Sequence, residues 1–227
     1  LASLAFGSAI DIDQVPATGI EHVDTTDVQI GGELGYGLKL LAYATREDEG
    51  ISLGVEPCFV PEDHPLSWVA GAFNAVSVYG HRTGHTLHYG RGAGGSPTAG
   101  AVVADILALA RGIYQPVFAP LVRNAMREQQ IQVLPHGELT SRFYLRFVVS
   151  DEAGALAHVS GVLAQEGISI SSLFQQEVEE GWDGPVPIIV TTHLTKRAAI
   201  ERACARADTK QPAVILRILD EHEERFG

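Results

Sequence analysis

The stretch RFYLRFVVSDEAGALAHVSGVLAQEGISISSLFQQEV, residues 142–178, has the most regular periodicity of the chain. Alternate residues are apolar over 142–150, which predicts a strand with one buried face. The residues on that face are Phe143, Leu145, Phe147 and Val149. After a turn at 151–154, apolar residues recur at helical spacing, and Gly167 suits the left-handed position that ends a helix. The helical stripe consists of Leu156, Val159 and Leu163, and a second strand is expected over 168–178.

The same rhythm continues to the C-terminus. A turn at 181–184 precedes a third predicted strand over 186–194, and a fourth is expected over 213–220. Between them Thr195 is predicted to cap a helix, whose apolar face consists of Ile200, Ala203, Cys204 and Ala207. The order strand, helix, strand, strand, helix, strand is the ferredoxin-like arrangement of two helices on an antiparallel sheet. Such a fold does not by itself define a function.

The N-terminal half is richer in glycine and predicts a mostly antiparallel sheet with a few helices. A helix is expected to begin with Thr25 or Thr26 as its N-cap, followed by strands over 36–47 and 51–60 and a hairpin around 79–85. Three prolines interrupt residues 113–140, which are therefore predicted to be a linker with one short helix. The expected class is α/β (α+β), with one domain over 1–112 and a ferredoxin-like domain over 141–227.

Composition excludes several classes of partner. The formal net charge is −12 and the lysines and arginines are scattered, which argues against nucleic acid and anionic membranes. The apolar stretch 101–110 is too short to span a bilayer and contains Asp105. Cys58 and Cys204 lack metal-binding spacing, so they are expected to be reduced thiols of a cytoplasmic protein.

The stretch YGRGAGGSPTAGAVVADILALARG, residues 89–112, contains G-x-G-x-x-G at Gly90, Gly92 and Gly95. A dinucleotide-binding fingerprint also needs a buried parallel strand before it and an acidic residue about 20 positions later. Here the preceding segment is polar, and no acidic residue lies between Asp105 and Glu128. The stretch is therefore not a complete dinucleotide fold. Two interpretations stay open, a tight turn without a ligand and a loop whose backbone N–H groups approach one.

Two longer motifs carry a resemblance to a known family. They are DHPL…V-x-G-x-F-N-A-V at 63–76 and YG-x-GAGG-x-PTA at 89–99. With them, residues 1 to about 111 resemble the substrate and dimerisation domain of homoserine dehydrogenases. The remainder resembles an ACT domain, a regulatory module that some bacterial members carry at the C-terminus.

The resemblance implies a reaction and a cofactor. The family interconverts L-aspartate 4-semialdehyde and L-homoserine with NAD or NADP, in threonine, methionine and isoleucine biosynthesis. It binds the nucleotide mainly through an N-terminal Rossmann domain that these 227 residues do not include. The GAGG loop is implied to border the cofactor near the nicotinamide, which assigns cofactor contacts to Gly92, Ala93, Gly94 and Gly95.

No catalytic residue is assigned within the chain. By resemblance, a catalytic lysine would lie three residues before Leu1 and a substrate-binding acid further upstream. The chain is therefore expected to be the C-terminal portion of a longer enzyme and inactive alone. Lys39 is interpreted as a strand lysine with a packed stem and a solvated ammonium group. Asp11 and Asp13 either line the substrate side or lie on a solvent-facing strand end.

The histidines show no metal-binding spacing with carboxylates or thiols, so no metal site is predicted. They are expected at the surface or in the hairpin, and they are His64, His81, His85 and His88.

The resemblance to ACT domains also implies an effector site, where the first strand turns into the first helix and usually across a dimer interface. The usual D-x-P-G-x-L motif has Ala153 here in place of proline. Free N–H groups at the helix start suit an amino-acid carboxylate, and Asp151 or the serines at 169 and 171 could meet its ammonium group. The assigned effector residues are Asp151, Gly154, Ala155, Leu156, Ile168 and Ser169. The alternative is an ACT domain that only dimerises.

The leading hypothesis is a homoserine dehydrogenase portion that L-threonine inhibits through its ACT domain, assembled as a homodimer or homotetramer. The alternative from another class is a non-catalytic regulatory protein that binds amino acids.

Overall fold

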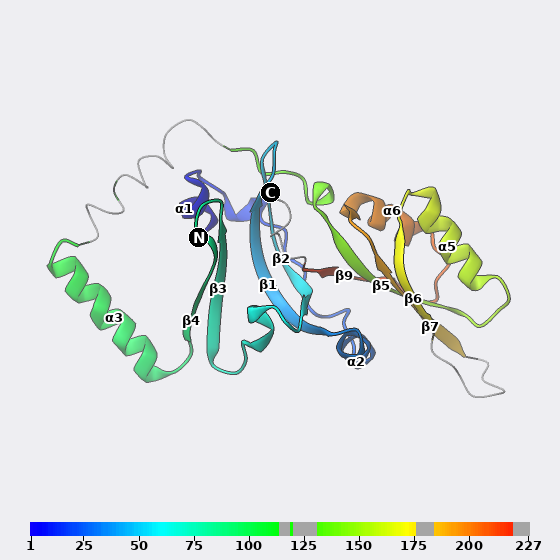
Figure 1. Ribbon diagram of the computed structural model, residues 1–227, viewed down its shortest axis with the longest axis horizontal. Coiled ribbons are helices and arrows are strands. Elements are labelled where there is room, and N and C mark those ends of the chain that lie inside the picture. Colours follow the sequence, from blue (N-terminus) through cyan, green and yellow to red (C-terminus); the bar gives the residue numbers. More distant parts are fainter. Residues whose placement is uncertain (114–118, 120–130, 176–183, 220–227) are drawn as a thin grey trace. The chain divides into compact units, whose positions relative to one another are not determined.

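The structure is a computed structural model that describes residues 1–113, 119, 131–175 and 184–219 (Figure 1). Its contacts form two compact units. Of the described residues, 1–14, 63–113, 119 and 131–133 belong to the first, here called the hairpin unit. Residues 15–62 and 134–219 belong to the second, here called the sheet unit. This division by packing cuts across the predicted linear order of segments, because residues 15–62 pack with the C-terminal part of the chain.

One sheet runs through the sheet unit in the order β1-β2-β9-β5-β7-β6, with the short β8 paired to β5. Its strands are β1 (Tyr36–Arg46), β2 (Ile51–Pro61), β5 (Thr140–Ser150), β6 (Ile170–Gln175), β7 (Pro185–Thr192), β8 (Thr195–Lys196) and β9 (Val214–Ile218). β2 runs parallel to β9, with Cys58 opposite Arg217 and Phe59 opposite Ile218, while the other described pairs are antiparallel. The β1–β2 hairpin therefore extends the sheet of the ferredoxin-like domain (Figure 1).

The predicted ferredoxin-like order is confirmed. The helix α5 (Ala155–Gln165) follows β5, and α6 (Arg197–Arg206) follows β8. Gly167 has φ +72 just after α5, as expected for a left-handed helix end. The prediction that Thr195 caps α6 was wrong, because Thr195 pairs with β5 in β8 and Lys196 is the residue before the helix. Leu156 is 38% exposed, so the buried stripe of α5 is Val159, Val162 and Leu163 instead.

One face of the sheet packs against α5 and α6. All four alternating residues predicted for β5 lie in this core, together with Ile188 and Val190 of β7 and Ile200 of α6. Each of these side chains is nearly or fully buried. Burial of this apolar surface is the main favourable contribution to the fold of the domain.

The other face of β5 packs against α2 (Thr25–Glu33) and a second core of Phe59, Tyr144, Ile189, Leu216 and Ile218. The N-cap of α2 is Asp24, so the prediction of Thr25 or Thr26 was wrong. The carboxylate of Asp24 accepts hydrogen bonds from the backbone N–H groups of Thr26 (2.8 Å) and Asp27 (3.2 Å), and the carboxylate of Asp27 accepts one from Asp24 N (3.0 Å). This capping box satisfies donors that a threonine at the first helical position cannot reach.

Two adjacent glycines of α2 give a matched stability test. A methyl group at Gly31 would lie 2.3 Å from Cε1 of the fully buried Phe59, whereas nothing lies within 4 Å of one at Gly32. We expect Gly31→Ala to lower the free energy of unfolding by about 1–3 kcal/mol through overpacking. Gly32→Ala should raise it by about 0.5–1 kcal/mol through helix propensity. Urea unfolding of both variants measures this, and equal effects would contradict the packing of α2 on Phe59.

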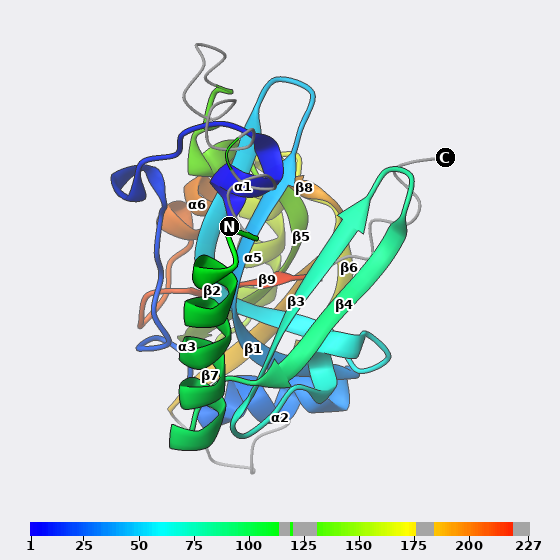
Figure 2. The same ribbon diagram turned by 90° about the vertical axis from the view of Figure 1, so that its left-hand side faces the viewer.

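The hairpin unit contains α1 (Ala2–Phe6), two short 3-10 helices at Ile12–Gln14 and Pro65–Trp68, and the predicted hairpin of β3 (Phe73–Gly80) and β4 (Gly84–Arg91). The 16-residue helix α3 (Gly95–Ala110) follows β4 after a short loop at residues 92–94 (Figure 2). Gly84 takes φ +66 at the turn, as its place in a tight hairpin requires. The third 3-10 helix, His136–Glu138, belongs to the sheet unit.

Some predictions fall where the structure gives no description, namely most of the linker 113–140 and of the turn 181–184. Among the helices that are described, none combines the length and the apolar character needed to cross a membrane. Cys58 and Cys204 are free thiols. Burial raises the pKa of Cys58 to about 11 and that of Cys204 to about 12.

Candidate functional site

The glycine loop between β4 and α3 is exposed and is held by the backbone of one residue. The carbonyl of Ala72 accepts hydrogen bonds from Gly92 N (3.0 Å) and Ala93 N (3.4 Å). Gly94 has φ +125 and precedes α3, and its carbonyl accepts from Thr98 Oγ1 (2.8 Å). The N–H groups of Gly92 and Ala93 therefore bind within the loop region itself.

The glycines of the loop differ in whether a side chain would fit at their positions. A Cβ at Gly92 would lie 1.6 Å from Asn74 Nδ2, so the exposed side chain of Asn74 would have to move to admit it. No atom lies within 4 Å of a Cβ at Gly90 or Gly95. Together with the positive φ of Gly94, this leaves the backbone at Gly94 and Gly95 open to a ligand at the start of a long helix. The loop thus has features that suit the edge of a dinucleotide site.

The turn between β5 and α5 has similar local geometry. Gly154 has φ +102 at the N-cap of α5, with no atom within 4 Å of an added Cβ. Ala155 N donates to the carbonyl of Glu152 (3.1 Å), and His158 N donates to that of Gly154 (2.9 Å). Asp151, Gly154 and Leu156 are exposed. The turn presents an open helix start to solvent, as an amino-acid carboxylate requires.

The predicted partner of this turn lies elsewhere in the same chain. Tyr144 of β5 and Ser172 of β6 both pair with Thr191, whereas Ser150 pairs with Pro185 at the opposite end of β7. The start of β6 is thus about 20 Å along the sheet from the end of β5. A single chain therefore does not bring Ile168 and Ser169 to the turn.

The residues at the start of β6 also differ in whether a ligand could reach them. The side chain of Ile168 is buried in the α5–α6 core, and the carbonyl of Ser169 accepts from His193 N (2.9 Å). Ser171 is exposed at a register shift in the ladder between β6 and β7. Ser169 and Ser171 are thus the exposed serines at the start of β6.

The candidates for the substrate side do not form a common site. Asp11 and Asp13 lie in and beside a 3-10 turn rather than at a strand end, and Asp11 lines an open groove of about 770 Å³ together with Gln14 and residues 131–133. Lys39 lies half-buried in β1, opposite Cys58 of β2. Lys39 is in the sheet unit and Asp11 in the hairpin unit, so the structure assigns them no shared chemistry.

His64 was expected at the surface, but it is only 1% exposed. Its Nδ1 accepts a hydrogen bond from Leu66 N (3.1 Å), so in the neutral ring Nε2 carries the proton and donates to Tyr79 Oη (3.1 Å). The ring of Tyr79 stacks on His85, whose Nε2 lies 2.8 Å from Ser77 Oγ. His64 thus fixes the segment before the 3-10 helix onto the hairpin. Within the described ranges no three His, Cys, Asp or Glu side chains group as metal ligands.

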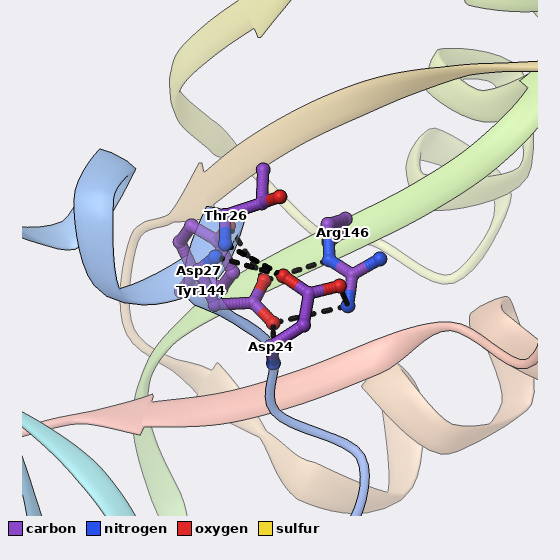
Figure 3. Close-up of polar contacts among 5 residues, drawn as sticks. All are labelled: Asp24, Thr26, Asp27, Tyr144 and Arg146. Atoms are coloured by element: carbon purple, nitrogen blue, oxygen red, sulfur yellow. Dashed lines mark hydrogen bonds and ion pairs between the residues drawn. The ribbon is translucent and has the colours of Figure 1, made fainter.

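The strongest polar cluster was not predicted at all, and it joins α2 to β5 (Figure 3). Arg146 of β5 is 7% exposed. Its Nε donates to Asp27 Oδ1 (2.7 Å), and its Nη2 donates to Asp27 Oδ2 (3.0 Å) and lies 2.8 Å from Asp24 Oδ2. Tyr144 Oη also donates to Asp27 Oδ1 (2.9 Å). The fully buried Asp27 carboxylate is therefore paired at both oxygens.

These contacts fix the protonation states in the cluster. Burial alone would lower the pKa of Arg146, but its hydrogen bonds to Asp27 and the charges of Asp27 and Asp24 raise it overall. Burial and the neighbouring Asp27 raise the pKa of Tyr144, so its hydroxyl keeps its proton. The cluster is thus a buried pair of a guanidinium group and a carboxylate, to which the Tyr144 hydroxyl adds a hydrogen bond.

A second cluster links β2 to α6 and β9 on the opposite face of the sheet. Arg197 of α6 donates to Glu56 of β2, and both side chains are buried. Arg217 donates from Nε to Ser141 Oγ (3.2 Å), and its guanidinium lies 4.2 Å from the ring centre of Tyr43. The buried polar atoms without a partner in the described part of the chain are Tyr43 Oη, Ser52 Oγ, Glu56 Oε1, Arg197 Nε and Arg217 Nη1. This cluster is less fully satisfied than the one around Asp27.

His136 is expected to make the stability of the sheet unit depend on pH. Burial lowers its pKa below the ordinary value, the charge of Arg217 adds to this, and Glu201 opposes it. The unfolded chain therefore binds the proton first as the pH falls through about 6.5. We expect the free energy of unfolding to decrease from pH 7.5 toward pH 5.5, and less so in His136→Asn. Urea midpoints at both pH values measure this, and an identical slope in the variant would contradict it.

Known proteins match both parts of the chain. The family model described as homoserine dehydrogenase matches residues 1–107, and the ACT domain model matches residues 143–203. The homoserine dehydrogenase of Neisseria gonorrhoeae is 36% identical over 230 residues, covering 98% of this chain and 52% of that protein. The homoserine dehydrogenase of Helicobacter pylori is 35% identical over 211 residues, covering 93% and 48%.

Solved structures agree in fold. A homoserine dehydrogenase from Thiobacillus denitrificans superposes with a TM-score of 0.84 at 33% identity, covering 96% of this chain and 51% of that one. The chain spans about half the length of the curated relatives it matches. It carries both family segments in the order that the sequence predicted. Residues 1–107 therefore match the homoserine dehydrogenase family, and residues 143–203 match the ACT domain family.

Proposed function

We propose that these 227 residues supply the substrate and dimerisation segment (1–112) and the regulatory segment (141–227) of a cytoplasmic homoserine dehydrogenase. The enzyme would interconvert L-aspartate 4-semialdehyde and L-homoserine with NAD or NADP. The observation that carries this proposal is the 36% identity to a homoserine dehydrogenase over nearly the whole chain. The reduced thiols are compatible with the cytoplasm.

The cofactor would meet the chain at the glycine loop. Among the four residues predicted for this role, the backbone N–H groups of Gly94 and Gly95 are the better donors, because those of Gly92 and Ala93 already bind Ala72. The open space at Gly95 supports the same assignment. The bound nucleotide would supply the hydride, and the loop would close one side of its site.

The polypeptide is expected to have no activity of its own, because the family resemblance assigns the nucleotide fold and the catalytic lysine to residues outside it. Purified, it should not form NADPH or NADH from homoserine, while the protein that contains it in its source cells should be several hundred residues long. Homoserine oxidation by the 227 residues alone would contradict the proposal. A native mass equal to that of this chain would favour the non-catalytic, amino-acid-binding alternative.

The regulatory segment would bind L-threonine at the turn of Asp151, Gly154, Ala155 and Leu156. The carboxylate would meet the free N–H groups at the start of α5, and the ammonium group would meet Asp151. Ile168 and Ser169 could contribute only from a second copy, because one chain holds them at the other end of the sheet. The effector site is accordingly proposed at an interface between two ACT domains.

Assembly as a homodimer or homotetramer is part of this proposal. In the hairpin unit, Val102, Ile106 and Leu109 of α3 are more than half exposed, and Val76 and Val78 of β3 are 43% exposed. Apolar faces of this kind are typical of contact surfaces. Light scattering at micromolar concentration should give at least twice the 24.3 kDa mass of the chain, and a monomer would contradict the assembly.

A further inference from the structure

We propose that Arg146 is a positioning residue through which the ACT domain holds α2 of the homoserine dehydrogenase segment. In the regulated enzyme, this contact would carry the effect of bound effector from β5 to α2. The second statement rests on the proposed function, whereas the first concerns the free chain alone.

The location of Arg146 is the first argument. It lies in the middle of β5 within the matched ACT domain, whereas Asp24 and Asp27 lie within the matched homoserine dehydrogenase segment. A buried guanidinium is tolerated only with counter-charges and hydrogen bonds. Every counter-charge that the structure gives Arg146 comes from the other family segment. Within the described residues, the ACT domain therefore buries a charge that the carboxylates at the start of α2 neutralise.

The geometry makes the contact directional. Arg146 binds Asp27 through two nitrogens, and the planar fork fixes the carboxylate in both distance and angle. Asp24 and Asp27 also form the capping box of α2, so their carboxylate oxygens accept hydrogen bonds from backbone N–H groups at the start of the helix. A shift of β5 relative to α2 therefore strains the start of the helix itself.

The connections around the cluster form a closed path. α2 leads through Gly35 into β1, whose partner β2 pairs with β9, and β9 pairs with β5, which carries Arg146. Glu62 N at the end of β2 also donates to the carbonyl of Gly35 (3.0 Å). Between β2 and β9 the ladder is short, with the pairs Cys58–Arg217 and Phe59–Ile218. The Arg146 contact closes this path on the α2 face, opposite the Glu56–Arg197 pair.

An apolar double variant can remove the ion pair without unfolding the domain. Apolar residues of similar volume can replace such a pair with little loss of stability. The double variant Asp27→Leu/Arg146→Met should therefore keep the fold while it removes the fork. Arg202→Met is the matched control, because Arg202 pairs with Glu166 (2.8 Å) between α6 and α5 and does not reach α2.

Hydrogen exchange of the full 227-residue chain without ligand tests the positioning role. In the wild-type chain, the amides of α2 and β5 should open together. In Arg146→Met, those of residues 28–34 should exchange at least tenfold faster, with much smaller changes in β6 and β7, and Arg146→Lys should give an intermediate effect. A uniform change across the unit, or no change in α2, would overturn the proposal.

The same measurement with L-threonine tests the transmission. Bound threonine should alter α2 exchange severalfold in the wild-type chain and in Arg202→Met. In the double variant it should bind with the same affinity but leave α2 unchanged. A response of α2 in the double variant, or none in the wild-type chain despite binding, would overturn this part. If threonine fails to bind the wild-type chain, the effector assignment fails, and the exchange without ligand still decides the role of Arg146.

Discussion

Replacement of Asp27 by alanine should lower the free energy of unfolding of the sheet unit by about 3–5 kcal/mol. The variant leaves Arg146 buried with only the half-exposed Asp24 as a counter-charge, and it removes the acceptor of Tyr144. It also takes away half of the capping box of α2. The loss arises mainly from the uncompensated charge, since the carboxylate itself contributes little apolar burial.

Urea unfolding followed by circular dichroism measures this effect. The control is Glu138→Ala, which breaks an ion pair with Lys196 of similar length (2.6 Å) but with both side chains exposed. That variant should cost less than about 1 kcal/mol. A similar small loss for Asp27→Ala would mean that the buried network does not hold α2 on the sheet.

Replacement of Gly154 by aspartate should abolish L-threonine binding, with at least a 100-fold loss of affinity. The new carboxylate would occupy the space at the start of α5 where the effector carboxylate is proposed to bind, and the two charges would repel. Because no atom lies within 4 Å of the added Cβ, the fold should lose only the cost of a side chain at φ +102, about 1–2 kcal/mol. Calorimetric titration measures the binding.

The matched control is Gly84→Asp. Gly84 also has a positive φ, +66, and open space around its Cβ, but it lies in the turn of the β3–β4 hairpin, in the hairpin unit. It adds the same charge at another strained glycine outside the proposed site, so its threonine affinity should be unchanged. Binding that survives Gly154→Asp in a folded chain would place the pocket elsewhere.

The sequence predicted the ferredoxin-like domain well because each strand and helix there has a clear apolar period. The four alternating residues of β5 are all in the core, and Gly167 ends α5 as expected. Helix caps were less predictable, since Asp24, Thr25 and Thr26 are adjacent and all can cap. Contact with the buried Arg146 distinguishes Asp24 from its neighbours, and this contact is not local in sequence.

The sequence did not predict that strands of both family segments form one sheet. Each segment resembled a different family, which suggested two separate cores. Two features fit the shared sheet once the structure is known. Nearly every residue of β2 is buried in the structure, which is typical of a strand covered on both faces rather than of an exposed hairpin. Arg146 also interrupts the apolar run of β5, on the face opposite Phe143 and Leu145. Neither feature identifies its partner, because pairing between distant segments depends on the folded topology.

The most direct test of the proposed function uses the native protein that contains these 227 residues, purified from its source cells. Homoserine-dependent reduction of NAD or NADP is measured with and without L-threonine, and D-threonine serves as the control. We predict turnover that L-threonine inhibits and D-threonine does not. A folded native protein with no homoserine-dependent turnover, or with turnover that L-threonine leaves unchanged, would contradict the account.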